Sequence, residues 1–248
     1  MLSDIKHGQN LSNRNNIWKK KPVLRELYKH YYKKIINYTV AGKTLEIGGG
    51  SGDLKNFCEE TIVSDIQLTH GLDVVSDAQF LPFANSTFDN VILCDVLHHI
   101  ESPPMFFDEA KRVLKSGGRI VLLEPVITPI SHLVLGLTHP EPIYMKHDPF
   151  YKGPVNPKKN PFDANQAIPT LIFCRKKGLK RFSIENPDLN IISCKLLSLF
   201  AYPLSGGFRE WNLIPKSFIK PLLRVESVLM PILGPIMAFR VLIIIEKN

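Results

Sequence analysis

Residues 44–54 read TLEIGGGSGDL, an apolar strand that runs directly into a glycine-rich turn. Glycines in such a turn let the backbone approach a ligand closely, and the amides at the start of a following helix can hold an anionic or polar group. A dinucleotide fingerprint, GxGxxG, would need a glycine where Asp53 stands, and no GK[ST] follows. The segment therefore predicts a ligand-binding turn at the end of a strand, with a dinucleotide site disfavoured and a P-loop excluded.

Short apolar runs alternate with amphipathic stretches along most of the chain. Apolar residues at helical spacing predict helices, and short apolar runs between turn residues predict strands. Such alternation is typical of βαβ units, so we expect an α/β fold with a doubly wound, mostly parallel sheet. The predicted strands are 43–47, 61–65, 90–94, 119–123, 180–185 and 238–246, and the predicted helices are 16–37, 53–59, 104–114 and 163–177.

The chain divides into a short basic part and one larger domain. Residues 1–40 are expected to form a basic N-terminal arm and helix, with nine Lys or Arg against two acidic residues, so most of the formal charge of +8 lies there. Residues 41–248 are expected to form a single domain. Within it, residues 126–162 and 189–236 are rich in proline or aliphatic residues, and we expect both to be inserted lid segments.

Composition excludes several classes of protein. With 44% hydrophobic and 22% charged residues, the chain is neither disordered nor collagenous nor a coiled coil. The four cysteines form no CxxC pair, which excludes a zinc finger and a disulfide framework and predicts a reducing, cytoplasmic location. We expect no membrane span, since no run of about eighteen uncharged apolar residues is present, and no secretion, since the N-terminus is polar.

Several motifs follow the first turn in a fixed order. Residues 46–52 read ExGxGxG, Asp65 ends the second strand, residues 77–83 read DAQFLPF, Phe88-Asp89 precedes the third strand, and residues 112–118 read RVLKSGG. Together they resemble the class I S-adenosylmethionine-dependent methyltransferases, in particular the group of the ubiquinone/menaquinone C-methyltransferases with a methyltransferase type 11 domain. The resemblance covers residues 43–125, with a serine in place of the usual proline in the last motif. It implies a seven-stranded Rossmann-like sheet.

The resemblance also implies S-adenosylmethionine as the cofactor, with S-adenosylhomocysteine as its product. An adenosyl cofactor independently calls for a carboxylate at its vicinal hydroxyls, a flat apolar slot and a polar group at the exocyclic amine. Asp65, Ile66 and Asp77 supply these three types, although the two acids would also suit turn caps. The cofactor-binding residues that the resemblance implies are Glu46, Gly48, Gly50, Gly52, Asp65, Ile66, Asp77, Ala78 and Asp95.

Two adjacent histidines follow the third predicted strand. His99, and in second place His98, would orient or deprotonate a methyl acceptor, and the alternative is that they cap or pack a helix start. The lid adds further His, Tyr and acidic residues between positions 132 and 151, but with no HxxxH or paired-carboxylate spacing. We therefore expect no metal ligand in this chain.

These observations predict a metal-independent methyltransferase that acts through oxygen or carbon on a small-molecule or lipid-linked acceptor. The apolar insertions and the basic arm suggest peripheral contact with the inner face of an anionic membrane. Cover of the core or a dimer interface is the preferred alternative. A catalytically inactive adenosylmethionine-binding scaffold or regulatory protein stays open, and an NAD-type oxidoreductase is disfavoured. Nucleic acid is not an expected partner, because residues 95–98 do not form the N/D-P-P-Y motif used on flipped bases.

Overall fold

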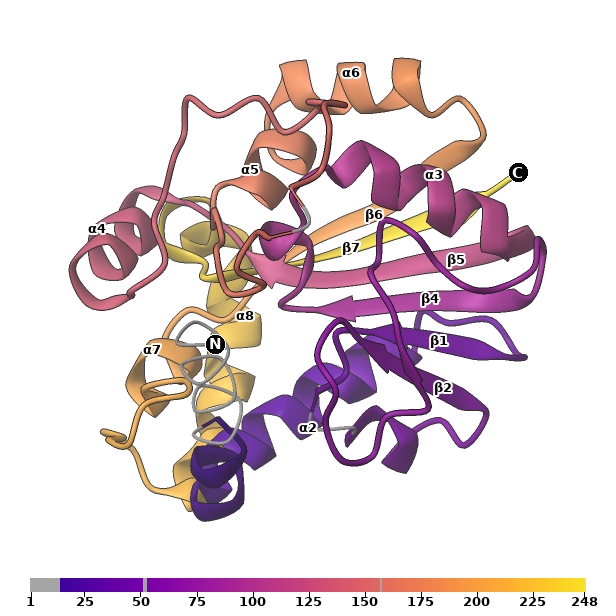
Figure 1. The fold of residues 1–248 in the computed structure, drawn as a ribbon. Coiled ribbons are helices and arrows are strands. Elements are labelled where there is room, and N and C mark those ends of the chain that lie inside the picture. The colour runs from indigo at the N-terminus through magenta and orange to yellow at the C-terminus, as the bar shows by residue number, and fades with distance from the viewer. Residues whose placement is uncertain (1–13, 51–52, 157) are drawn as a thin grey trace.

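A seven-stranded sheet runs through the centre of the protein (Figure 1). The computed structural model describes residues 14–50, 53–156 and 158–248. Only β7 runs against its neighbours, and the other neighbouring strands pair in parallel. The strands, in the sheet order β3-β2-β1-β4-β5-β7-β6, are β1 (Thr44–Ile47), β2 (Thr61–Asp65), β3 (Val74–Val75), β4 (Phe88–Cys94), β5 (Leu114–Pro125), β6 (Leu189–Leu197) and β7 (Arg240–Lys247). The predicted doubly wound, mostly parallel α/β sheet is confirmed.

Helices cover both faces of this sheet, as Figure 1 shows. One face carries α3, α5 and α6, whose phenylalanines pack together, and the other carries α2 and α8. Neighbouring residues of β4 alternate between the two cores, since Val91 and Leu93 face the first and Ile92 the second. The helices are α2 (Pro22–Ile36), α3 (Pro103–Val113), α4 (Pro129–Thr138), α5 (Ile168–Phe173), α6 (Lys176–Glu185), α7 (Ala201–Ser205) and α8 (Ile219–Met237), with 3-10 turns η1 (Asp53–Asn56), η2 (Leu97–His99) and η3 (Lys216–Phe218).

Three predicted elements need correction. The strand expected at 180–185 is part of helix α6, because Phe182 is buried and Ile184 exposed on a helix that Arg181 and Glu185 brace as an i,i+4 ion pair. The helix expected at 53–59 is only the short turn η1. The sixth strand, β6, instead lies at the start of the predicted insertion 189–236, where it pairs with β7 at the sheet edge.

The two predicted insertions meet each other beside the carboxyl end of the sheet. In the first, Thr128 and Ser131 form a capping box that starts α4, and an irregular segment follows as far as α5. The second contributes α7 and α8, and α8 contacts α4. Among the described residues, no helix is both long enough and apolar enough to cross a bilayer. These segments therefore stand beside the strand ends, where open α/β sheets bind ligands.

Candidate functional site

The glycine-rich turn after β1 brings the backbone close to two neighbouring strands. Gly48 has a positive φ of 71°, and a Cβ atom there would lie 2.2 Å from a methyl carbon of Val96. A Cβ atom on Gly49 would lie 2.3 Å from a methyl carbon of Val63. Contacts this short leave no room for a side chain. The predicted residue Gly52 lies outside the described residues.

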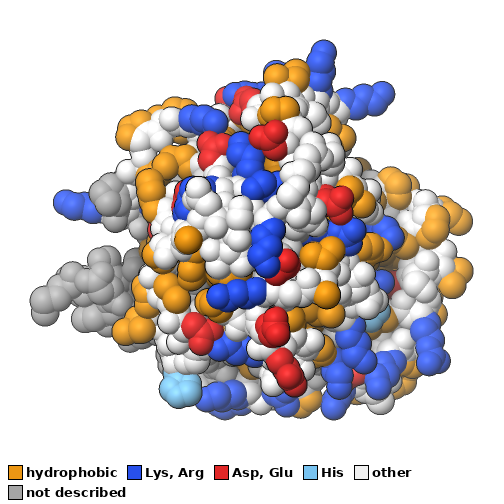
Figure 2. Space-filling model, turned by 90° about the vertical axis from the view of Figure 1, so that its right-hand side faces the viewer, with side chains coloured by type: hydrophobic (Ala, Val, Ile, Leu, Met, Phe, Trp, Pro, Cys, Tyr) orange, Lys and Arg blue, Asp and Glu red, His pale blue; other side chains and the backbone are white. Residues whose placement is uncertain are grey.

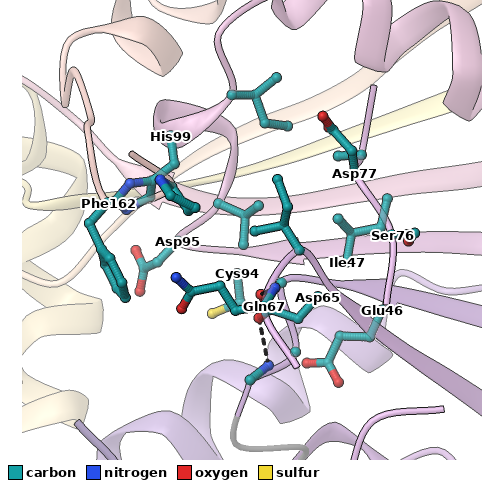
Figure 3. Close-up of a pocket in the computed structure, with 18 of the residues that line it drawn as sticks. Glu46, Ile47, Asp65, Gln67, Ser76, Asp77, Cys94, Asp95, His99 and Phe162 are labelled. Atoms are coloured by element: carbon teal, nitrogen blue, oxygen red, sulfur yellow. Dashed lines mark hydrogen bonds between the residues drawn. The ribbon is translucent and has the colours of Figure 1, made fainter. Parts of the chain in front are cut away.

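Asp65, at the end of β2, is held by backbone amides. Its Oδ2 accepts a hydrogen bond from the amide of Gly50 at 3.1 Å, drawn as a dashed line in Figure 3, and its Oδ1 accepts one from Gln67 at 3.0 Å. Burial raises the pKa of Asp65, and these amide hydrogen bonds oppose the rise. Each carboxylate oxygen keeps a lone pair for a ligand.

A cavity of about 260 Å³ opens between the glycine-rich turn, Asp65 and η2; we call it the first cavity. Two buried polar atoms at its wall, the Ser76 Oγ and the His99 Nδ1, have no hydrogen-bond partner among the described residues. Buried polar groups are normally paired, so both atoms point to a bound ligand. The sequence-predicted residues that line this cavity are Glu46, Gly48, Gly50, Asp65, Ile66, Asp77, Ala78, Asp95 and His99.

Asp77 lies at the first cavity but is engaged within its own turn. Its Oδ1 accepts hydrogen bonds from the backbone amide of Gln79 at 2.8 Å and from the Gln79 side chain at 3.1 Å. Gln79 in turn accepts the amide of Ser102 at 2.9 Å. The turn-capping interpretation of Asp77 therefore has direct structural support, and its free polar capacity toward a ligand is smaller than that of Asp65.

Asp95 joins three distant parts of the chain beneath the first cavity. It follows β4 with a positive φ of 61°. Its Oδ2 accepts a hydrogen bond from the Tyr28 hydroxyl of α2 at 2.7 Å, and its Oδ1 forms an ion pair with the buried Arg240 of β7. The Arg240 guanidinium lies 4.0 Å from the ring centroid of Tyr202. This network fixes the floor of the cavity and connects it to the inserted segments.

His98 is buried next to the first cavity and does not line it. Its Nδ1 lies 2.6 Å from a Glu124 oxygen, and its Nε2 lies 3.3 Å from Glu141. Burial by itself lowers the pKa of His98, but the two carboxylates raise it to about 9. His98 is therefore an imidazolium between two acids at neutral pH, and the other Glu124 oxygen accepts the amides of Val96 and Leu97.

His99, unlike His98, carries no charge at neutral pH. Burial, followed by the positive charge of His98, lowers the pKa of His99 to about 3, so its ring is neutral at pH 7. The His99 Nε2 lies 3.8 Å from Glu141 Oε1. Burial raises the pKa of Glu141, but the hydrogen bond and the positive charge of His98 lower it well below its ordinary value. A neutral imidazole beside a carboxylate can accept a proton and keep the resulting cation paired.

Three of these side chains also have the composition of a cation site. Ligand atoms of His98, His99 and Glu141 all lie within 4.8 Å of one another. Two imidazoles and a carboxylate can hold a divalent transition metal. Two features already balance the Glu141 charge, however: the His98 imidazolium, and the Arg14 guanidinium at 3.4 Å. Residue spacing did not predict this cluster, because Glu141 reaches the histidine pair only through the irregular segment of the lid.

Two further cavities adjoin the first. The second cavity, of about 900 Å³, lies between α4, α7 and the lid, with a mostly apolar wall that includes Leu135, Tyr202 and Phe239. The third cavity, of about 60 Å³, lies between the other two and is lined by His98, His99 and Glu141. All three share Arg14 and Phe208. A molecule in the second cavity can therefore reach toward His99 from the side opposite the glycine-rich turn.

Sequence reasoning missed several residues of the site, most of which come from outside the motif region. The main ones are Arg14, Gln67, Ser76, His139, Gln166 and Phe208. His139 lies 3.7 Å from Glu141, and Gln166 donates a hydrogen bond to Glu141 at 3.2 Å. The density of His, Tyr and acidic residues between 132 and 151 was the available signal, but it carried no information about which of them meet the histidine pair.

Comparison with known proteins places this site in context. Residues 45–122 match the methyltransferase domain family. An uncharacterized protein of Methanocaldococcus jannaschii is 32% identical over 104 residues, which cover 39% of this chain and 51% of that protein. The ubiquinone/menaquinone biosynthesis C-methyltransferase of Teredinibacter turnerae is 27% identical over 124 residues, which cover 41% of this chain and 50% of that enzyme. The matches thus span about half the length of these curated relatives.

Solved structures match over most of the chain. A SAM-dependent methyltransferase from Archaeoglobus fulgidus superposes with a TM-score of 0.52 at 18% identity, covering 90% of this chain and 94% of that one. The geranyl diphosphate C-methyltransferase of Streptomyces coelicolor, solved with Mg²⁺, geranyl diphosphate and S-adenosyl-L-homocysteine, gives a TM-score of 0.51 at 13% identity, covering 91% and 81%. These likenesses establish that the fold is shared.

Proposed function

Residues 45–122 carry a methyltransferase domain, and from this premise we propose that the chain is an S-adenosylmethionine-dependent methyltransferase. The main support for this proposal is the first cavity, where a glycine-rich turn with no room for side chains faces Asp65. The orphaned Ser76 hydroxyl and the neutral His99 lie at the same wall. The acceptor is proposed to be a small molecule or a lipid-linked molecule, methylated at oxygen or carbon without a metal ion.

The residues of the first cavity suit the chemical parts of the cofactor. Asp65 has lone pairs for two vicinal ribose hydroxyls, and the half-exposed Ile66 offers an apolar surface to the adenine. Asp77 and Ala78 lie at the proposed adenine edge, while Glu46 and the glycines border the rest of the cavity. When bound, S-adenosylmethionine supplies a sulfonium methyl group that is already activated. The chain then has to hold, align and dehydrate the reactants.

His99 is proposed to orient the acceptor and to accept its proton. It lines both the first and the third cavity, so it stands between the cofactor side and the acceptor side. Its neutral ring can accept a hydrogen bond from the acceptor and take the proton as the methyl group is transferred, when that proton becomes strongly acidic, and Glu141 stabilises the imidazolium that forms. His98 is proposed as a positioning residue that holds Glu141 in place. Asp95 shapes the cavity floor through its contacts with Tyr28 and Arg240.

The second cavity is proposed to hold the body of the acceptor. Its volume of about 900 Å³ and the aliphatic and aromatic side chains in its wall favour a largely apolar molecule, while Arg14, Glu141, Asp163 and Arg209 in the same wall can meet polar groups on it. The reactive end of this molecule would reach the third cavity. Since all four cysteines are free thiols, we place the reaction in the cytoplasm, with a lipid-linked acceptor presented at the inner face of a membrane.

Methyl transfer from isotope-labelled S-adenosylmethionine tests the proposal, with prenylated quinols, polyprenyl phosphates and catechols as probe acceptors. We expect label in at least one of these classes. Asp65→Ala should weaken cofactor binding, whereas His99→Ala should leave cofactor binding intact and lower turnover by about 10²- to 10⁴-fold. The matched control is His70→Ala, an exposed histidine outside all three cavities. Full turnover by His99→Ala would remove His99 from catalysis. Cofactor binding without transfer to any probe would favour a scaffold.

A further inference from the structure

Helix α8 exposes apolar side chains along its outer side. Among its 19 residues only Ile219, Glu226 and Gly234 are buried. Val228 is 75% exposed and Ile232 is 73% exposed, and both lie on the same side of the helix as Val225 and Ile236. A helix on a water-exposed protein surface normally places charged or polar residues on its outer side. From Ser227 to the end of α8 no residue carries a charge.

Helix α4 extends this exposed region. It contacts α8, and its exposed side chains include Ile130, Leu133 and Leu137 at spacings of three and four residues. Leu137 is 78% exposed. Helix α4 contains no charged residue unless His132 is protonated. We call the exposed apolar residues of α4 and α8 together the apolar face. Single exposed aliphatic residues are common on proteins, but several of them on two helices that touch point to an interaction surface.

The charged side chains at the beginning of α8, next to the apolar face, are basic, and one of them, Lys220, pairs with Glu26 of α2 at 3.5 Å. Lys216, Lys220 and Arg224 are exposed at the beginning of α8. The only acidic residue of α4 and α8 is Glu226, which is buried and accepts the amides of Phe200 and Ala201. By contrast, the side of the molecule shown in Figure 2 mixes Lys and Arg with Asp and Glu. A basic end and an uncharged apolar length are what an amphipathic helix presents to an anionic bilayer.

The α4 part of the apolar face borders the second cavity. Leu137 belongs to the exposed side of α4 and at the same time lines the second cavity. Trp211, just before α8, lines the same cavity and is partly exposed. Tryptophan is enriched at the interface between lipid and water. An acyl or prenyl chain that leaves a bilayer at this face would therefore have an apolar route into the second cavity past Leu137 and Trp211.

We propose that the apolar face of α4 and α8 docks on an anionic lipid bilayer and that the second cavity takes a lipid acceptor directly from it. Delivery of the acceptor rests on the proposed function, whereas membrane docking does not. A second copy of this chain fits the face less well, because neither helix exposes an acidic residue to meet Lys216, Lys220 and Arg224 of the copy. A bilayer with acidic headgroups meets both the charge and the apolar residues.

Vesicle co-sedimentation tests the docking proposal with the full chain. We expect binding to vesicles of phosphatidylcholine with about 30% phosphatidylglycerol, and weaker binding in high salt or without the anionic lipid. The double variant Val228→Asp, Ile232→Asp should bind at least about tenfold more weakly, since two aliphatic side chains lose their burial in lipid. The matched control is Ile184→Asp, which places the same charge at an exposed aliphatic residue of α6, outside the apolar face. This variant should bind like the wild type.

Two readouts separate the outcomes. S-Adenosylhomocysteine binding by calorimetry, measured on the same preparations, shows whether each variant is folded and whether the proposed function itself stands. Failure of wild-type protein to bind the anionic vesicles, or unchanged binding by the double variant, overturns the docking proposal while leaving the cofactor result untouched. Sedimentation velocity completes the test. A wild-type dimer that the double variant converts to a monomer would assign the apolar face to a second copy and also overturn the proposal.

Discussion

The first and second cavities lie next to each other but are assembled from the chain in different ways. The acidic groups of the first cavity stand between residues 46 and 101, mostly at or after the ends of successive parallel strands. The second cavity combines residues as distant as Arg14 and Phe239, with walls from α4, the lid and α7. The carboxyl ends of neighbouring parallel strands lie at one edge of the sheet, so the sheet alone brings the residues of the first cavity together. The second cavity depends instead on how two inserted segments pack.

This difference suggests a division of roles. The first cavity has backbone amides and carboxylates in fixed positions, as a constant cofactor requires. The second cavity has a mostly apolar wall, and its shape is set by the inserted segments. Such segments can vary from one protein to another, as a variable acceptor requires. His99 and Glu141 stand where the two cavities meet. The following predictions test this division.

The largest effect is expected at the buried acid that pairs with His98. Glu124→Gln removes the charge opposite the buried His98 imidazolium, so we expect a loss of roughly 3–5 kcal/mol in the free energy of unfolding. Denaturant unfolding measures this loss. Glu185→Gln is the control, because its partner Arg181 is at the surface and such a pair contributes about 1 kcal/mol or less. Equal small losses for both variants would mean that His98 is uncharged and that the link between the cavities is weak.

The next effect separates the two acids of the first cavity. Asp65→Ala should weaken S-adenosylhomocysteine binding by about 10- to 100-fold, the worth of hydrogen bonds to a charged group. Asp77→Ala should weaken it by roughly fivefold or less, because Gln79 already occupies the Asp77 carboxylate. Calorimetry on both variants gives the ratio. A larger loss for Asp77→Ala would reverse the roles assigned to the two acids.

A smaller effect concerns stability and pH. The pKa of His98 is raised in the folded protein from 6.5 to about 9, so its stabilising contribution is complete below pH 6.5 and is lost as the pH rises toward 9. His99, whose pKa is lowered to about 3, stays neutral throughout this range. We therefore expect wild-type stability to fall more steeply between pH 7 and 9 than that of His98→Asn. Burial lowers the pKa of Lys21 to about 8, so Lys21 also titrates in this range. Its contribution is the same in both proteins and cancels when their stabilities are compared. Parallel pH profiles would show that His98 does not titrate there.

The smallest effect is expected from metal removal. Both nitrogens of His98 face carboxylates and Arg14 faces Glu141, so the cluster of His98, His99 and Glu141 is balanced in charge without a cation. We predict that purified protein holds no stoichiometric metal by elemental analysis and that EDTA leaves its thermal midpoint unchanged. A bound divalent ion whose removal lowers the midpoint would assign this cluster to metal binding.

How much the sequence could predict follows the same division. The glycine-rich turn, Asp65 and the alternation of strands and helices were accessible because each depends on a short motif or on local periodicity. The strand expected at 180–185 was wrong because Phe182 and Ile184 alternate over too few residues to distinguish a strand from a helix with one buried side. Glu141, His139 and Gln166 were beyond prediction as a group, since only the packing of the lid against η2 brings them to His98 and His99.

The central claim is that the first cavity binds an adenosyl cofactor, and isothermal calorimetry with S-adenosylhomocysteine and NAD tests it most directly. The account predicts stoichiometric binding of S-adenosylhomocysteine to the wild-type protein, markedly weaker binding to Asp65→Ala, and no binding of NAD to either. Binding of NAD that Asp65→Ala weakens, with none of S-adenosylhomocysteine, would contradict the account and assign the first cavity to a dinucleotide.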